Sequence, residues 1–352
     1  MMGNAMVVIN AMPSKIHEAI KKENLSIEVT TRCTSNCTYC FVRSGSSEYH
    51  DLDYRTVLSI IKEGYEIGYR HLHITGGEPL LWGHLFDICD NAIVMGYESI
   101  FLNTNGFLFD SNTLKKLKSI KGLNLSISLL GFPDIHDTFR GYNSFIKTAQ
   151  AIEMALNHNI PLYLFCVVGK SLLAHLPHFV QWAFQKFPGI KEITLIQLIR
   201  VSGNADKVFN ELLTPDDFVS LVRIISLLNV YGFSVSLLEN PLAAVVAQML
   251  ELPWFSSSPH LIRPGRLTIK ADKSITIAHS SCQSLGTYSR GKLHRILTSE
   301  VYLHGIEDDC NTCASCKHMA VCRKAGMQRP SEPFRDMQET IPYCKRVLDS
   351  LL

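Results

Sequence analysis

The chain alternates short runs of apolar and β-branched residues with longer segments whose apolar residues recur at helical spacing. Segments 55–68 and 144–159 show the helical pattern clearly. Because the strand-like and helix-like segments alternate, the pattern predicts an α/β fold with a parallel sheet, and the apolar character of the runs predicts burial on both faces. The predicted strands are residues 25–31, 71–76, 99–106, 123–131, 161–169 and 192–200.

The pattern changes in the last third of the chain. Residues 213–228 predict a helix, with Thr214 as N-cap and Pro215 at the first helical position. After about residue 255, segment 266–280 predicts a β-hairpin that turns at Asp272 and Lys273. A loop-rich and cysteine-rich tail follows, so we expect a large α/β part followed by a small C-terminal domain.

Composition and charge narrow the classes of function. The chain has 352 residues, which is enough for a substantial core, and a formal net charge of +2. It contains no long run of Lys or Arg, so we expect no nucleic-acid partner. The apolar stretch near the start is too short for a membrane span or a convincing signal peptide, and we expect a cytoplasmic protein with no membrane partner. Eleven cysteines in such a chain indicate metal or redox chemistry.

Three of these cysteines lie close together, directly after the first predicted strand. Cys33, Cys37 and Cys40 form a CxxxCxxC pattern. A zinc site or a disulfide framework would usually use an even number of cysteines. Three thiolates can instead hold three irons of a cubane 4Fe–4S cluster and leave the fourth iron free to bind a small molecule. The odd number therefore indicates a reactive cluster rather than one for simple electron transfer.

This loop resembles the signature loop of the radical S-adenosylmethionine (SAM) superfamily, including the aromatic Tyr39 before the last cysteine. Three further segments resemble that family's motifs in the same order: TGGEPLL at 75–81, NTNG at 103–106, and SLLGFPDIHDTFRG at 128–141. The resemblance implies a partial (β/α)6 TIM-like barrel. It also implies reductive cleavage of SAM to a 5'-deoxyadenosyl radical that abstracts a hydrogen atom from a substrate, with the cofactors supplying the difficult step.

The resemblance also implies which residues contact SAM. Glu78 would bind the methionine ammonium group, Ser128 and Arg140 the carboxylate, and Tyr39 would lie near the adenine. Arg140 could instead form a surface ion pair, and Asn105 could be a turn residue. Leu130 departs from the family pattern, because many relatives have an aspartate there. The predicted SAM-binding residues are Tyr39, Gly76, Gly77, Glu78, Asn105, Ser128 and Arg140.

The cysteine-rich tail resembles the SPASM/twitch extension of radical SAM enzymes. The resemblance implies that four of its cysteines ligate one auxiliary 4Fe–4S cluster, although a structural zinc site could use the same ligands. A second auxiliary cluster is not expected, because Gly326 occupies the position of a further cysteine. Cys282 and Cys310 lie nearby, and either could contribute to the site. The predicted ligands are Cys313, Cys316, Cys322 and Cys344. Cys89 and Cys166 are expected to pack in the core.

These observations predict four regions and a class of reaction. The regions are an N-terminal extension (1–24), the radical SAM barrel (25–232), a bridging segment (233–265) and the auxiliary cluster domain (266–352). We expect a radical SAM enzyme that modifies a ribosomally made peptide or protein and takes electrons from a flavodoxin or ferredoxin.

Three alternatives remain open at this stage. The first is radical oxidation, decarboxylation or rearrangement of a small metabolite, such as an antibiotic precursor or a haem-type tetrapyrrole. The second is a non-catalytic iron–sulfur or zinc scaffold. The third concerns the histidines between residues 71 and 84 and in the HDTFRG segment. They could include a proton-transfer group, although a histidine with satisfied hydrogen bonds is the simpler interpretation.

Overall fold

The computed structural model of the protein describes most of the barrel and parts of the C-terminal third. The described residues are 24–40, 42, 48–199, 208–238, 240–253, 265–277, 279, 284–300, 302, 316–325 and 343–351. Cys282, Cys310, Cys313 and Gly326, as well as nearly all of the expected N-terminal extension, lie outside them.

One sheet runs through the described part of the chain, in the order β10-β9-β8-β1-β2-β3-β4-β5-β6-β7. Strands β1 to β7 are parallel to their neighbours, β8 adds to β1 in parallel, and β9 and β10 complete that edge in antiparallel fashion. The sheet is open, as in a partial barrel. The strands are β1 (Asn24–Glu28), β2 (His71–Thr75), β3 (Ser99–Thr104), β4 (Leu123–Ser128), β5 (Leu162–Val168), β6 (Ile193–Gln197), β7 (Val235–Leu238), β8 (Leu267–Ile269), β9 (Ser274–Thr276) and β10 (Gly286–Thr287).

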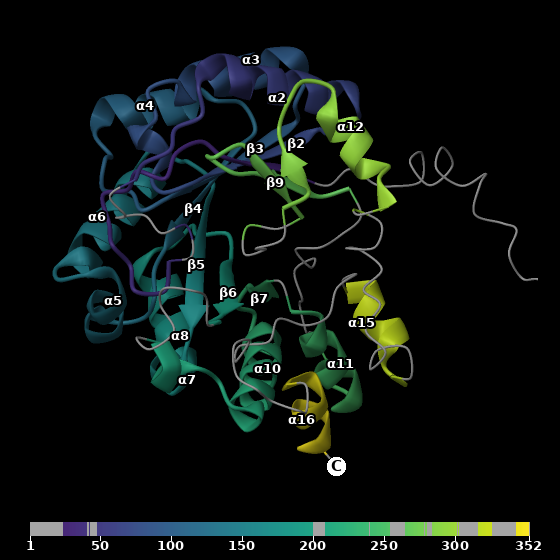
Figure 1. Ribbon diagram of the computed structural model, residues 1–352. Helices are drawn as coiled ribbons and strands as arrows, with labels where there is room; N and C mark the ends of the chain where they lie inside the picture. The colour runs from purple at the N-terminus through teal and green to yellow at the C-terminus, as the bar shows by residue number, and fades with distance from the viewer. Residues whose placement is uncertain are drawn as a thin grey trace, which may run out of the picture.

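Helices surround the outside of the curved sheet (Figure 1). None of the described helices combines the length and apolar character needed to cross a bilayer. The α-helices are α2 (Tyr54–Glu66), α3 (Leu85–Met95), α4 (Ser111–Ser119), α5 (Pro133–Arg140), α6 (Ser144–Asn157), α7 (Lys170–Leu173), α8 (Leu176–Lys186), α10 (Pro215–Val230), α11 (Pro241–Met249), α12 (Lys292–Leu297), α15 (Met319–Ala325) and α16 (Tyr343–Asp349); the short 3-10 turns are η1 (Pro79–Leu81) and η2 (Phe209–Glu211).

The two faces of the sheet differ in chemistry. The helix-covered face carries fully buried apolar side chains, such as Leu25, Ile74 and Leu164. The alternate positions, which face the inside of the barrel, carry buried polar groups such as Ser26 and Thr194. Burial is complete on the helix-covered face, whereas the inner positions of β2, β3 and β5 are only partly buried and include, beside the polar groups, the aromatic residues Phe101, Tyr163 and Phe165.

The sequence predicted the first six strands correctly, although each ends earlier than expected. The residues past each strand end belong to loops at the carboxyl edge of the sheet, where barrel folds build their sites. The hairpin is confirmed as β8 and β9, and Thr214 caps α10 through a capping box with Asp217. The short strand β7 was not predicted. It lies in the expected bridging segment and extends the sheet beyond residue 232.

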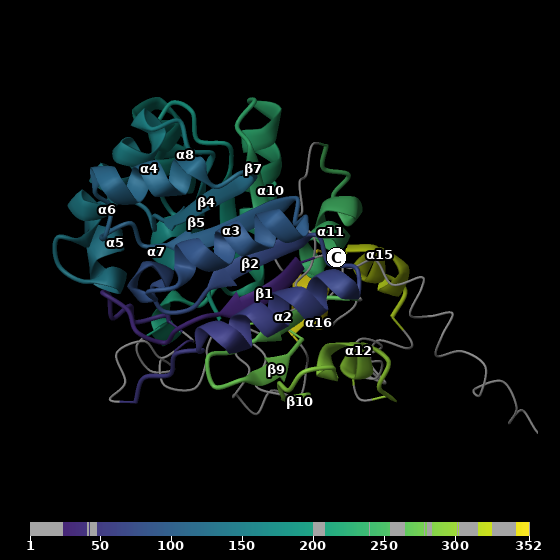
Figure 2. The ribbon, with the colours of Figure 1, turned by 90° about the horizontal axis from the view of Figure 1, so that it is seen from above.

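The C-terminal third touches both edges of the open sheet. The β8–β9 hairpin joins the β1 edge, while α15 packs on α11 and α16 packs on α10, near the β7 edge. Figure 2 shows α12, β9 and β10 together on one side of the barrel and α15 beside α11. The described parts of this region therefore lie at both edges of the open sheet.

Candidate functional site

The three-cysteine loop leaves the carboxyl end of β1 and is held against the end of α5. The backbone N–H of Thr38 donates to the carbonyl of Phe139 over 2.9 Å, and the N–H of Cys40 donates to the carbonyl of Cys37 over 3.1 Å. The loop thiols are only partly exposed, and burial raises the pKa values of Cys33 and Cys37. Thiolates in this loop therefore need a positive charge nearby, which bound iron would supply.

Glu78 is a fully buried carboxylate that joins the ends of two strands. It accepts hydrogen bonds from the hydroxyl of Thr104 and the backbone N–H of Asn105, each over 2.8 Å, and from the N–H of Leu80 over 3.2 Å. Burial raises its pKa, which these donors oppose. Glu78 thus fixes the loop after β2 to the loop after β3, whatever it also contributes to SAM binding.

Asn105 continues this connection to the cysteine loop. Its side-chain amide donates to the hydroxyl of Thr34 over 2.8 Å and lies 3.8 Å from the Cys33 sulfur. Its carbonyl oxygen accepts from the N–H of Phe107 over 2.9 Å. Asn105 is therefore a turn residue and a support for the cysteine loop at once. The chain Glu78–Asn105–Thr34 links three strand ends in one site.

Gly76 and Gly77 allow the backbone after β2 to lie directly against residues 30–32. A β-carbon at Gly77 would lie 2.2 Å from the Arg32 carbonyl oxygen, and one at Gly76 would lie 2.3 Å from the Thr30 carbonyl oxygen. Gly76 also has a φ of +145°, which favours glycine. The backbone N–H of Gly77 donates to Thr30 over 2.7 Å. The two glycines therefore let the loop after β2 pack directly against the segment that leads into the cysteine loop.

Arg140 is buried at the end of α5 and is not a surface ion pair. Its guanidinium donates to the hydroxyl of Tyr39 over 3.1 Å. Its Nε is buried and has no hydrogen-bond partner among the described residues. A buried donor of this kind needs an acceptor, and a carboxylate suits guanidinium geometry. Arg140 and Tyr39 thus form one polar wall beside the cysteine loop, while Ser128 lies half-buried at the end of β4.

The histidine and the aspartate of the HDTFRG segment form hydrogen bonds within the protein. His136 accepts from the backbone N–H of Leu130 over 3.1 Å and pairs with Thr148 over 3.3 Å. Burial lowers its pKa to about 3, so it stays neutral. Asp137 accepts hydrogen bonds from the start of α6, including the N–H of Phe145 over 2.7 Å. The simpler interpretation of His136, a satisfied core histidine, is confirmed.

The tail cysteines within the described residues lie on or beside two short helices at one end of the molecule. Cys322 lies in α15, Cys316 just precedes it, and Cys344 lies in α16. The fourth predicted ligand, Cys313, lies outside the described residues. Cys89 and Cys166, by contrast, are fully buried in α3 and β5, as predicted for core residues.

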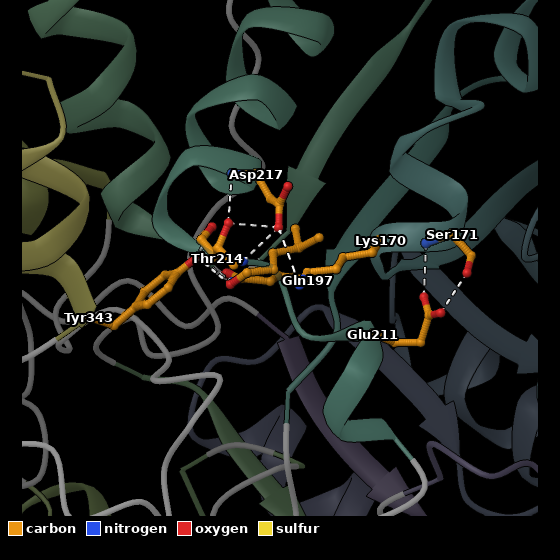
Figure 3. A network of polar contacts seen from close by, with 8 residues as sticks. Lys170, Ser171, Gln197, Glu211, Thr214, Asp217 and Tyr343 are labelled. Carbon is orange, nitrogen blue, oxygen red and sulfur yellow. Dashed lines mark hydrogen bonds and ion pairs between the residues drawn. The ribbon is translucent and has the colours of Figure 1, made fainter.

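Tyr343, next to Cys344, anchors α16 to the barrel (Figure 3). Its hydroxyl lies 3.1 Å from the carbonyl of Leu213 and accepts from the side-chain amide of Gln197, at the end of β6, over 3.3 Å. Asn240 donates to the same glutamine over 2.6 Å. The polar network therefore connects the helix that carries Cys344 with the carboxyl ends of β6 and β7.

A polar cluster on the inner face of the barrel includes His73, one of the histidines left open as a proton-transfer group, and two residues that the sequence did not single out, Glu28 and His279. His279 contacts both Glu28 and His73, although the three residues come from distant segments. The alternation in β1 and β2 places Glu28 and His73 on the inner face. No sequence signal pairs either of them with His279, which lies 206 residues beyond His73.

The comparisons with known proteins agree with this geometry. The family model described as Radical SAM superfamily matches residues 27–183. A probable GTP 3',8-cyclase from Saccharolobus solfataricus is 26% identical over 209 residues, a match that spans 57% of this chain and 66% of the relative, just under two thirds of its length. A similar protein from Sulfurisphaera tokodaii is 26% identical over 178 residues, which cover 50% of this chain and 56% of that one.

Solved structures share the fold over more of the chain. Native anSMEcpe with bound AdoMet has a TM-score of 0.71 at 20% identity, covering 93% of this chain and 95% of its own. Streptococcus suis SuiB bound to the precursor peptide SuiA has a TM-score of 0.70 at 13% identity, covering 87% and 72%. These likenesses extend to the C-terminal third, beyond the residues that the family model matches. Residues 27–183 of the chain therefore carry a radical SAM domain.

Proposed function

We propose that the chain is a radical SAM enzyme that binds a 4Fe–4S cluster through Cys33, Cys37 and Cys40. The observation that carries this proposal is the connection from Glu78 through Asn105 to the cysteine loop, which holds three strand ends in one buried site. When bound, the cluster and SAM together supply the one-electron chemistry that removes a hydrogen atom from a substrate. The protein contributes position, charge and shielding.

The surrounding residues have complementary roles in this proposal. The unpartnered Nε of Arg140 and the hydroxyl of Ser128 would bind the SAM carboxylate. Glu78 keeps room for the SAM ammonium group because a carboxylate can accept about four hydrogen bonds and three are used here. Tyr39, fixed by Arg140, would lie beside the adenine. Gly76 and Gly77 hold the backbone that shapes this edge.

The proposed substrate is a ribosomally made peptide or protein. The support is the likeness to structures with peptides, namely SuiB with precursor peptide SuiA and anSMEcpe with the Cp18Cys peptide. Both likenesses cover at least 87% of this chain, including the C-terminal third. The polar inner face of the barrel would supply hydrogen bonds to such a substrate.

A small-molecule substrate is the second candidate. The observation that favours it is the similarity to proteins named as probable GTP 3',8-cyclases. That similarity covers 57% of this chain. Oxidation, decarboxylation or rearrangement of another small metabolite belongs to the same alternative.

The tail would hold one auxiliary 4Fe–4S cluster through Cys313, Cys316, Cys322 and Cys344. The packing of α15 on α11 and of α16 on α10 supports this, because both helices sit on elements next to the β7 edge of the barrel. Four thiolate ligands leave no iron open, so the cluster would serve electron transfer and help fold the tail. We infer that a flavodoxin or ferredoxin supplies electrons.

Substitution of one loop cysteine tests the proposed activity. In anaerobically reconstituted Cys37→Ala protein, we expect 5'-deoxyadenosine formation from SAM under reducing conditions to fall to background, because three irons would have only two ligands. The matched control is Cys89→Ala, a buried thiol in α3, which should retain activity. Wild-type rates of 5'-deoxyadenosine formation in Cys37→Ala would refute the cluster assignment.

A second measurement separates the two substrate classes. Reconstituted enzyme is incubated with SAM and either GTP or a deuterated peptide encoded beside its gene. Deuterium in 5'-deoxyadenosine from the peptide supports maturation, whereas GTP-dependent product supports the small-molecule alternative.

A further inference from the structure

The inner face of the barrel contains an unbroken chain of hydrogen-bonding groups. The Nδ1 of His279 lies 3.3 Å from Glu28 Oε1, and the Nε2 of His279 lies 3.3 Å from His73 Nδ1. Ser26 Oγ lies 3.2 Å from the same His73 nitrogen. Glu28, His279 and His73 therefore form a line. The imidazole of His279 uses both of its ring nitrogens in this line, whereas the imidazole of His73 uses only Nδ1.

The open end of this line is His73 Nε2. This atom is buried and accepts or donates no hydrogen bond among the described residues, although the side chain of Asn103 on β3 lies near enough to His73 to oppose the lowering of its pKa by burial. His73 pairs in register with Ser26 on β1 and Phe101 on β3, so it lies on the polar inner face rather than under the helices. It also precedes the GGEP loop by only a few residues. A buried polar atom without a partner, just below the carboxyl ends of the strands, indicates a contact for a bound ligand.

Both histidines in the line are neutral. Burial lowers the pKa of His279 to about 3 and holds the pKa of His73 well below its usual range, and the positive charge of Arg266 acts in the same direction on both. Burial raises the pKa of Glu28 to about 7, with Lys270 lowering it and Asp272 raising it. Glu28 is therefore the member of the line whose charge changes near neutral pH, and the flanking charges come from segment 266–272.

The proton positions at the two ends of the line are coupled. When Glu28 is ionised, it accepts from His279 Nδ1–H. His279 Nε2 then accepts from His73 Nδ1–H, and His73 Nε2 is a bare acceptor. When Glu28 is protonated, every hydrogen bond reverses and His73 Nε2 carries a proton. Both arrangements satisfy each hydrogen bond in the line, and both keep the imidazoles neutral.

We propose that Glu28, His279 and His73 form a proton relay that takes a proton from a substrate group bound inside the barrel, with His73 Nε2 as the contact atom. The substrate's N–H or O–H bond breaks and an N–H bond forms at His73 Nε2. The Nδ1 proton of His73 passes to His279 Nε2, and the Nδ1 proton of His279 passes to Glu28. Nothing is oxidised or reduced in this step. Glu28 becomes neutral, and the substrate group takes up the negative charge. The assignment of the proton donor as substrate rests on the proposed function.

The coupling itself is measurable without a substrate. In the reconstituted full-length protein labelled with ¹⁵N-histidine, NMR reports which ring nitrogen of each histidine carries the proton, and a His73→Gln sample assigns the signal. We expect His73 Nε2 to lose its proton as the pH rises through about 7, in one transition and without an imidazolium signal. In Glu28→Gln the transition should disappear, because the amide does not titrate. Ser26→Ala should retain it, because the serine lies beside the line rather than in it.

Three results would overturn the relay: a His73 tautomer that stays constant from pH 6 to about 8.5, an imidazolium at His73, or an unchanged transition in Glu28→Gln. A purely structural role in holding His279 against the inner face would produce the first of these. The relay and the proposed function fail separately. Protein that shows the coupled transition but never cleaves SAM contradicts the radical SAM activity, whereas active protein without the transition contradicts the relay.

Discussion

At the scale of single residues, the site depends on close backbone contacts more than on charge. Glu78 and Asn105, which a family motif suggests as direct ligand contacts, use most of their hydrogen bonds to hold the protein's own loops. Gly77 matters because the backbone of residues 30–32 lies against it. A short motif such as GGEP thus meets two requirements: it supports the backbone that leads into the cysteine loop, and it leaves room for a ligand.

Gly77→Ala tests this requirement for space. The new β-carbon would lie 2.2 Å from a backbone oxygen, so the loop must shift and the Gly77–Thr30 hydrogen bond must lengthen. We expect the free energy of unfolding to fall by about 2 kcal/mol, and iron bound by the cysteine loop to decrease. Chemical unfolding and iron analysis measure both. Gly83→Ala is the matched control, because nothing lies within 4 Å of its β-carbon position, and equal stability of the two variants would contradict this account.

At the scale of elements, the local sequence pattern predicted the features that depend on neighbouring residues, namely single strands and a helix cap. Six strands and the cap of α10 follow from apolar runs and from Thr214, Pro215 and the first-turn acids. The pairing of β8 with β1 could not be predicted, because two short strands more than 200 residues apart carry no register information. The same holds for His279 beside His73. The roles of His136 and Asp137 were equally open, because only the packing of α5 on α6 decides between catalysis and support.

Tyr343→Phe tests how α16 is attached. The substitution keeps the ring against Phe218 but removes the hydroxyl that contacts Gln197 and Leu213. The Gln197 amide and the Leu213 carbonyl would each lose a hydrogen-bond partner, which should lower the free energy of unfolding by on the order of 1–3 kcal/mol. We expect faster hydrogen exchange in residues 343–351, measured by mass spectrometry. Tyr231→Phe, at a 73% exposed position after α10, is the control. Unchanged protection in Tyr343→Phe would mean that apolar packing alone holds the helix.

At the scale of the whole molecule, described parts of the C-terminal third lie at both edges of an open sheet. One part extends the β1 edge as a hairpin, and another brings α15 and α16 to α11 and α10. The polar inner face, the cysteine loop and the helices with Cys322 and Cys344 consequently belong to one body. Cys344 thereby lies on a helix that contacts the carboxyl end of β6 through Tyr343 and Gln197.

The number of clusters follows from this arrangement and from the ligand count. Anaerobically reconstituted protein should contain about eight irons, four in the loop of Cys33, Cys37 and Cys40 and four in the tail. Cys322→Ala should lower this to about four while SAM cleavage continues, because the tail ligands are separate from the loop. Cys89→Ala, whose thiol is buried in the core, should keep all eight. About four irons with one zinc would identify the tail as a structural zinc site, and about twelve irons would require a third cluster, with Cys282 or Cys310 among its ligands.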